Sequence, residues 1–177
     1  MINESTFMKL IDSKSELKEI LRDEHYYHIT LGEESQQEKE FYLFEAFKKS
    51  DFKKGLRIGI ISEGHGLKPS ILFDSANNVS YIGLNREVNV IDCENIAILK
   101  RLELDSLFYD MIPLESTLNI IIIHELGIKC ISENGDIIWQ YSTDVISDFK
   151  IIGETLKITT DEQIILIALS SGELVQM

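Results

Sequence analysis

A chain of 177 residues with 44% hydrophobic and 27% charged side chains has enough apolar material for one globular domain with a sizeable core. Its formal net charge of −13 disfavours binding to nucleic acid or to anionic membranes, because their phosphates would be repelled, and it is compatible with a basic protein partner. The longest apolar runs, at residues 120–123 and 164–169, are far shorter than the ~18 residues that a membrane span needs.

The N-terminus and the cysteines indicate the compartment. The first twenty residues are charged throughout and lack the apolar segment of a signal peptide. The two cysteines, Cys93 and Cys130, belong to no CxxC motif or Cys/His cluster, so they are expected to be buried thiols in a reducing environment. We therefore expect a cytoplasmic protein with no cofactor and no bound metal.

Residues 1–55 are expected to form an N-terminal helical segment that packs on the rest of the chain. Ser13 and Glu16 have the spacing of a capping box, and residues 26–30 are β-prone, as in an edge strand or an extended link. Residues 33–50 have acidic side chains early and lysines late, which suits the dipole of a second helix. The apolar faces of the two helices are expected to consist of Phe7, Leu10, Ile11, Leu17, Ile20 and Leu21, and of Phe41, Leu43, Phe44 and Phe47.

Residues 56–177 change to short β-rich segments separated by turn residues, which predicts an antiparallel β domain. Pro113 argues against a central strand over residues 104–114. The whole chain is thus expected to be a single compact α+β domain, mainly β, with the N-terminal helical segment packed on its β part.

Three segments, beginning near Val79, Ile120 and Lys157, repeat the same order of strands and turns. Matching Ile91, Ile131 and Leu169 gives spacings of 40 and 38 residues. A period of about 40 residues with three or four strands per unit is typical of propeller blades. In the second copy, Asn134-Gly135 predicts a type I′ hairpin, because both residues tolerate a positive φ.

Within CISENGDIIWQ, Gly135 is followed after three residues by Trp139, the only tryptophan of the chain. This pattern resembles the blade repeat of quinoprotein (PQQ-like) β-propellers over about residues 78–177. Gly172 matches the glycine in the third copy, whereas Asn95 and Leu99 replace the glycine and the tryptophan in the first. A closed propeller needs about four blades or more, and the chain has room for fewer. The resemblance therefore implies blade-like antiparallel meanders of a partial, unclosed propeller, without the central channel that would hold a quinone.

Two short stretches are candidates for chemistry. In Glu63-Gly64-His65-Gly66, an exposed imidazole could act as a base or a ligand, and the alternative is a glycine-rich turn that happens to contain a histidine. His124-Glu125 follows an apolar strand, and the alternative there is a hydrogen-bonded histidine at a strand end. If the two histidines end neighbouring strands, they could converge with Glu63 and Glu125 as carboxylate companions.

The sequence favours a non-catalytic function, because no P-loop, GxGxxG, GxSxG or HExxH motif occurs. Residues 1–55 carry a net charge of −3 and residues 56–177 carry −10. We expect a protein-interaction module with an acidic β surface, for example an immunity or antidote protein that binds a basic partner. The alternatives are a small metal-assisted hydrolase or ligand-binding enzyme using His65 and His124, and a structural subunit that pairs its open sheet edge with its own copy.

Overall fold

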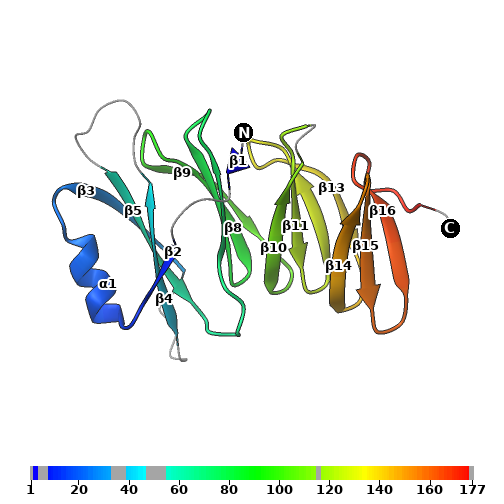
Figure 1. Cartoon of the computed structure of the whole chain (residues 1–177), viewed down its shortest axis with the longest axis horizontal. Coiled ribbons are helices and arrows are strands. Elements are labelled where there is room, and N and C mark those ends of the chain that lie inside the picture. Colours follow the sequence, from blue (N-terminus) through cyan, green and yellow to red (C-terminus); the bar gives the residue numbers. More distant parts are fainter. Residues whose placement is uncertain (1, 4–7, 33–38, 47–54, 115–116, 176–177) are drawn as a thin grey trace. The chain divides into compact units, whose positions relative to one another are not determined.

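A computed structural model describes residues 2–3, 8–32, 39–46, 55–114 and 117–175 (Figure 1). The fold is mainly β, as expected, with one short helix among the described residues. The chain divides into two compact units, residues 1–103 and residues 104–177, whereas the sequence led us to place a boundary near residue 55. Residues on both sides of that position share one sheet, because β3 (Tyr26–Leu31) and β4 (Glu40–Ala46) both pair with β5 (Gly55–Ser62).

The first unit contains two sheets. One is a five-stranded sheet in the order β1-β6-β7-β8-β9, and the other is a mixed sheet in the order β2-β4-β5-β3, in which β3 runs parallel to β5. Their packed faces form a shared core that includes Phe44, Ile58 and Ile82. The remaining strands of this unit are β1 (Ile2–Asn3), β2 (Met8–Ile11), β6 (Ser70–Asp74), β7 (Val79–Leu84), β8 (Glu87–Asp92) and β9 (Ala97–Glu103).

The helix expected over residues 33–50 is wrong where the structure describes that stretch, because β4 is a strand of the mixed sheet. Tyr42 and Phe44 face the core shared with the five-stranded sheet, and Phe41 and Leu43 face the helix on the other side. A strand buried on both faces has a continuous apolar sequence, which periodicity alone does not separate from a helix. Phe47 and Phe7 of the expected helical faces lie outside the described residues.

The helical segment expected over residues 1–55 is correct only for α1 (Lys14–Leu21). Ser13 caps this helix, because its Oγ accepts a hydrogen bond of 3.2 Å from the backbone N–H of Glu16. Leu17 and Leu21 pack with Leu43, so α1 covers the face of the mixed sheet opposite the shared core (Figure 1). The preceding residues form β2 instead of a helix, and residues 26–30 form the terminal strand β3, as the β-prone sequence predicted.

The second unit consists of two antiparallel meanders. The four-stranded sheet has the order β10-β11-β12-β13, and the three-stranded sheet has the order β14-β15-β16. Pro113 lies on the terminal strand β10, which agrees with its exclusion from a central strand. These strands are β10 (Phe108–Pro113), β11 (Ile120–His124), β12 (Gly127–Ile131), β13 (Ile137–Ser142), β14 (Ile146–Ile152), β15 (Thr155–Thr160) and β16 (Ile164–Ala168).

The turn between β12 and β13 differs from the type I′ hairpin that we expected. Gly135 has a φ of +79°, whereas Asn134 is not among the described residues with positive φ. The Gly135 N–H donates to the carbonyl of Ser132 at 2.9 Å, and the Ser132 N–H donates to the carbonyl of Asp136 at 2.9 Å. These bonds define a three-residue loop, in which a tight turn is followed by a left-handed glycine.

The corresponding turn between β8 and β9 shows that the first copy aligns one residue later than expected. Ile96, with a φ of +59°, takes the left-handed position that Gly135 occupies in the second copy. Lys100 pairs with Val90 as Trp139 pairs with Cys130, so Lys100 and not Leu99 is equivalent to the tryptophan. An isoleucine is strained at positive φ, but its side chain packs against the core of the first unit.

Trp139 joins the two sheets of the second unit. Its side chain packs against the core between them, and its ring lies directly over Gly172. A Cβ placed on Gly172 would lie only 2.5 Å from Cδ2 of this ring. The glycine of the third copy therefore leaves the space that the tryptophan ring of the second copy occupies.

Candidate functional site

His124, the last residue of β11, is a buried and hydrogen-bonded histidine. Its exposed fraction is 4%, and its Nδ1 lies 2.8 Å from Oγ of Ser106. The same Oγ accepts a hydrogen bond of 2.9 Å from the backbone N–H of Leu126. Ser106 is itself only 2% exposed, so the pair holds two loops together and offers no surface to a substrate.

The surroundings of His124 disfavour the charged form of its imidazole. Burial and the nearby ammonium of Lys129 lower the pKa of His124 below its usual 6.5, and Asp105 opposes this shift only partly. Lys129 is 7% exposed and its Nζ lies 3.1 Å from Oδ2 of Asp105. This hydrogen bond lowers the pKa of the Asp105 carboxyl. The arrangement is a buried cation held by a carboxylate at the surface, which stabilises the fold.

His65 follows β5 in a turn of the first unit and is exposed. Its Nε2 lies 3.0 Å from Oε2 of Glu63. Glu63 is also fixed through its backbone N–H, which donates to Oδ1 of Asn85 at 2.8 Å. The pair is a solvent-facing His–carboxylate contact at a turn.

The structure does not place the two histidines on neighbouring strands. His65 follows β5 of the mixed sheet, whereas His124 ends β11 of the four-stranded sheet in the other unit. Among the described residues, no group of three or more His, Cys, Asp or Glu side chains has the arrangement of a metal site. A catalytic role for His65, His124, Glu63 and Glu125 stays a prediction.

The cysteines are free thiols. Cys130 is buried in the core of the second unit, and burial raises its pKa to about 11. Cys93 is half-buried, and burial raises its pKa as well, although a hydrogen-bonding contact of 3.1 Å with Oγ of Ser80 opposes the shift. Neither thiol has the lowered pKa of a reactive cysteine.

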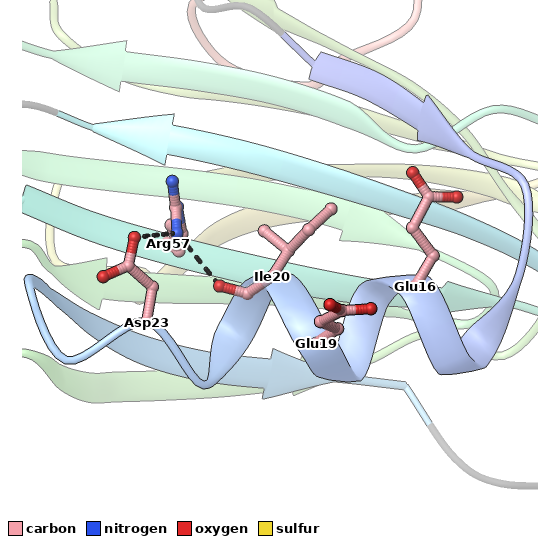
Figure 2. A pocket seen from close by; sticks show the side chains of 5 residues that line it. All are labelled: Glu16, Glu19, Ile20, Asp23 and Arg57. Carbon is pink, nitrogen blue, oxygen red and sulfur yellow. Dashed lines mark hydrogen bonds and ion pairs between the residues drawn. The ribbon is translucent and has the colours of Figure 1, made fainter.

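A pocket of about 340 Å³ lies between α1 and β5. Figure 2 shows Glu16, Glu19 and Ile20 on the helix, Asp23 just after it, and the guanidinium of Arg57 reaching them from the sheet. We call this the α1–β5 pocket.

Arg57 is held on several sides. Its Nη1 donates to the carbonyl of Ile20 at 2.9 Å and to Oδ2 of Asp23 at 3.0 Å. Its Nε donates to Oε1 of Glu45 at 2.6 Å, and its guanidinium carbon lies 3.6 Å from the centre of the Tyr26 ring. Burial opposes the charge, but the carboxylates outweigh it and raise the pKa of Arg57. The guanidinium therefore ties the C-terminal end of α1 to the mixed sheet.

The remaining carboxylates of the pocket belong to Glu16, which is half-buried, and to Glu19, which is exposed. Neither Glu16 nor Glu19 has an ion-pair partner among the described residues. The pocket thus has two carboxylates beside an arginine whose charge is already neutralised by Asp23 and Glu45. Sequence reasoning missed it because Arg57 is a single basic residue far along the chain from α1, and only the fold brings them together.

Charge is distributed unevenly between the units. Residues 104–177 contain 3 Lys/Arg and 12 Asp/Glu, a net charge of −9, whereas residues 1–103 contain 14 and 18, a net charge of −4. The second unit therefore carries most of the negative charge in fewer than half of the residues.

No protein-family model and no curated protein matches the chain. Solved structures of β-propeller type do. The dihydro-heme d1 dehydrogenase NirN, in complex with DHE, matches with a TM-score of 0.51 and 9% identity, over 78% of this chain and 33% of that one. BamB from Moraxella catarrhalis matches with a TM-score of 0.43 and 22% identity, over 59% and 35% of the two chains. The Pan2 WD40 domain of Neurospora crassa matches with a TM-score of 0.49 and 12% identity, over 64% and 38%.

The chain has the fold of a partial β-propeller. The likeness expected from Gly135 and Trp139 is therefore confirmed at the level of fold, and at these identities it concerns the fold alone. The chain spans only about a third of the length of these structures. No helix in the described part of the chain is long and apolar enough to cross a membrane.

Proposed function

We propose that this chain is a non-catalytic protein-interaction module whose acidic β surface binds a basic protein. The observation that carries the proposal is the net charge of −9 on residues 104–177. A surface with so strong a single sign of charge attracts a cationic partner over several ångströms and speeds its association. An antidote or immunity protein that covers a basic toxin domain in the cytoplasm is the specific form of this function that we propose.

A pair of matched variants tests the role of the charge. In the second unit, Asp144→Asn, Asp148→Asn, Asp161→Asn and Glu162→Gln remove four exposed carboxylates that form no side-chain ion pair among the described residues. In the first unit, the control combines Asp12→Asn, Glu19→Gln, Glu24→Gln and Glu103→Gln, which also remove four exposed carboxylates.

The purified full chain and both variants are used to capture partners from native lysate at low salt, and association rates of the partner recovered are measured against ionic strength. We expect the second-unit variant to bind at least about ten-fold more slowly than the wild type, and the control to bind nearly as fast. The rate for the wild type is expected to fall by about ten-fold or more between about 20 and about 500 mM salt. Recovery of no partner at any salt concentration, or equal effects of the two variants, would contradict the proposal.

A further inference from the structure

Terminal strands expose unpaired backbone N–H and C=O groups, and proteins protect them with charges, proline or a covering segment. Most terminal strands here follow this rule. The outer edge of β16 is covered, because the Val175 N–H donates to the carbonyl of Leu166 at 2.8 Å and Leu174 pairs with Ile167. Charged residues or proline occur on other terminal strands, for example Lys9 on β2, Asp110 and Pro113 on β10, and Asp148 and Lys150 on β14. The terminal strand β3, with the sequence YYHITL, has neither.

The strand β13 also lacks such protection, and unlike β3 it lies in the unit with a net charge of −9. It is the last strand of its sheet (Figure 1), and its sequence IIWQYS contains no charge and no proline. Ile137 and Ile138 are exposed at 46% and 49%. No described residue pairs with the backbone groups of β13 on the side away from β12.

The equivalent strand of the first unit, β9, has charged residues at positions that are uncharged on β13. Ile98 and Leu99 on β9 are exposed at 40% and 55%, as their counterparts on β13 are. The next two residues of β9 are Lys100 and Arg101, where β13 has tryptophan and glutamine. The same two positions therefore carry two positive charges on β9 and none on β13.

We propose that the free edge of β13 accepts an extended segment of a basic partner protein as an added strand. This proposal rests on the proposed function and names the place and mode of binding. A strand of six residues spans about 20 Å, so the partner segment is about six residues long, with apolar side chains alternating with lysine or arginine. Main-chain hydrogen bonds along the edge provide affinity, and contacts with the exposed isoleucines provide selectivity.

The charge around β13 decides between a foreign segment and a second copy of this chain. Glu133 and Asp136 lie in the turn before the strand, and Asp144 follows its end. Two copies pairing antiparallel along this edge would bring the acidic ends of one strand beside those of the other. Such like charges repel, and in each copy the second unit, which bears them, has a net charge of −9, so the edge favours a cationic segment.

Trp139 is the only tryptophan of the chain and lies on β13, so its fluorescence reports binding at this edge directly. The probe is a synthetic peptide of about ten residues in which valine and lysine alternate. Its controls are the same peptide with every backbone nitrogen methylated, which has no N–H group to donate to the edge of β13, and a peptide of alternating valine and glutamate. We expect a saturable change in emission with the first peptide alone.

Matched substitutions separate strand addition from simple charge attraction. Ile138→Asp adds negative charge but removes an apolar contact, so we expect the affinity for the valine–lysine peptide to fall by about ten-fold or more. The equivalent change on β9, Leu99→Asp, is expected to leave the affinity unchanged. If Ile138→Asp does not fold, the comparison of methylated and unmethylated peptides on the wild type still decides.

The proposal is overturned if the valine–lysine peptide leaves the emission unchanged up to millimolar concentration, if the methylated peptide binds equally well, or if the two aspartate variants lose affinity alike. Failure here is distinguishable from failure of the proposed function. A natural partner that is captured in a salt-dependent way but binds Ile138→Asp as tightly as the wild type would leave the interaction module intact and refute only its placement on β13.

Discussion

Replacing Gly172 by alanine tests the packing of the Trp139 ring against Gly172, the contact that joins the two sheets of the second unit. The new Cβ would lie 2.5, 2.6 and 2.8 Å from Cδ2, Cε3 and Cγ of the ring, closer than carbon atoms approach without displacement. The residue also has a φ of +74°, which costs an alanine about 1 kcal/mol. Forcing the ring to move adds about 1–3 kcal/mol, as for an overpacked core.

We therefore expect Gly172→Ala to lower the free energy of unfolding by about 2–4 kcal/mol. Gly153→Ala is the matched control, because Gly153 also has a positive φ, +60°, but a Cβ there would meet no atom within 4 Å. Gly153→Ala should lower the free energy of unfolding only by the cost of an alanine at positive φ, about 1 kcal/mol. Urea unfolding followed by far-UV circular dichroism, which does not depend on the tryptophan, measures both, and thermal melting of a chain that unfolds in one step should shift by about 4–16 °C for Gly172→Ala.

A double-mutant cycle tests whether the additional destabilisation by Gly172→Ala, compared with Gly153→Ala, comes from the contact with Trp139. In a Trp139→Leu background, Gly172→Ala should cost little more than Gly153→Ala does, because the ring that it displaces is gone. Equal destabilisation by the two glycine substitutions in the wild-type background would refute the reasoning, since it would leave no contribution from the contact.

Four further outcomes are expected. Ser106→Ala should destabilise the chain by about 2–4 kcal/mol in urea, because it leaves both His124 and the Leu126 N–H without their buried partner. Folding lowers the pKa of His124, so on acidification the imidazole binds a proton in the unfolded chain before it does so in the folded chain. The free energy of unfolding should therefore be unaffected by this group above about pH 6.5 and should decrease as the pH falls through the folded-state pKa. A His124→Asn variant should lack this decrease. Arg57→Met should destabilise the chain by about 1–3 kcal/mol by leaving the carboxylates around it unpaired, again measured in urea. Zn²⁺ should leave the melting temperature unchanged, and a rise abolished by His65→Ala would instead support a metal site.

Much of the fold could be predicted from the sequence, because each blade-like strand is short and bounded by turn residues. The expected glycine at 135 and tryptophan at 139 take their structural places. The sequence did not fix the register of the first copy, since Ile96 occupies a left-handed position that no propensity favours for an isoleucine. Only the pairing of Lys100 with Val90 shows that the alignment shifts by one residue there.

The N-terminal part was harder to predict for a different reason. The residues of β4 are buried on both faces, so their apolar sequence fits a helix stripe as well as a strand. The α1–β5 pocket depends on a contact between residues 16–23 and Arg57, which no local pattern encodes. The hydrogen-bonded alternative for His124 is the one observed, and its serine partner lies 18 residues earlier in the chain.

The two units show how a shared strand arrangement acquires different surfaces. The strands β9 and β13 occupy the same place in their meanders, pair through the same bulge and expose apolar residues at the same two positions. At the next position β9 has a lysine and β13 has a tryptophan, whose ring packs against the core and over Gly172. The substitution that locks the sheets of the second unit together therefore also removes a charge from its outer edge. In this unit one residue, Trp139, contributes both to the packing of the sheets and to the loss of charge at the edge, and the surplus of acidic side chains favours a cationic segment there.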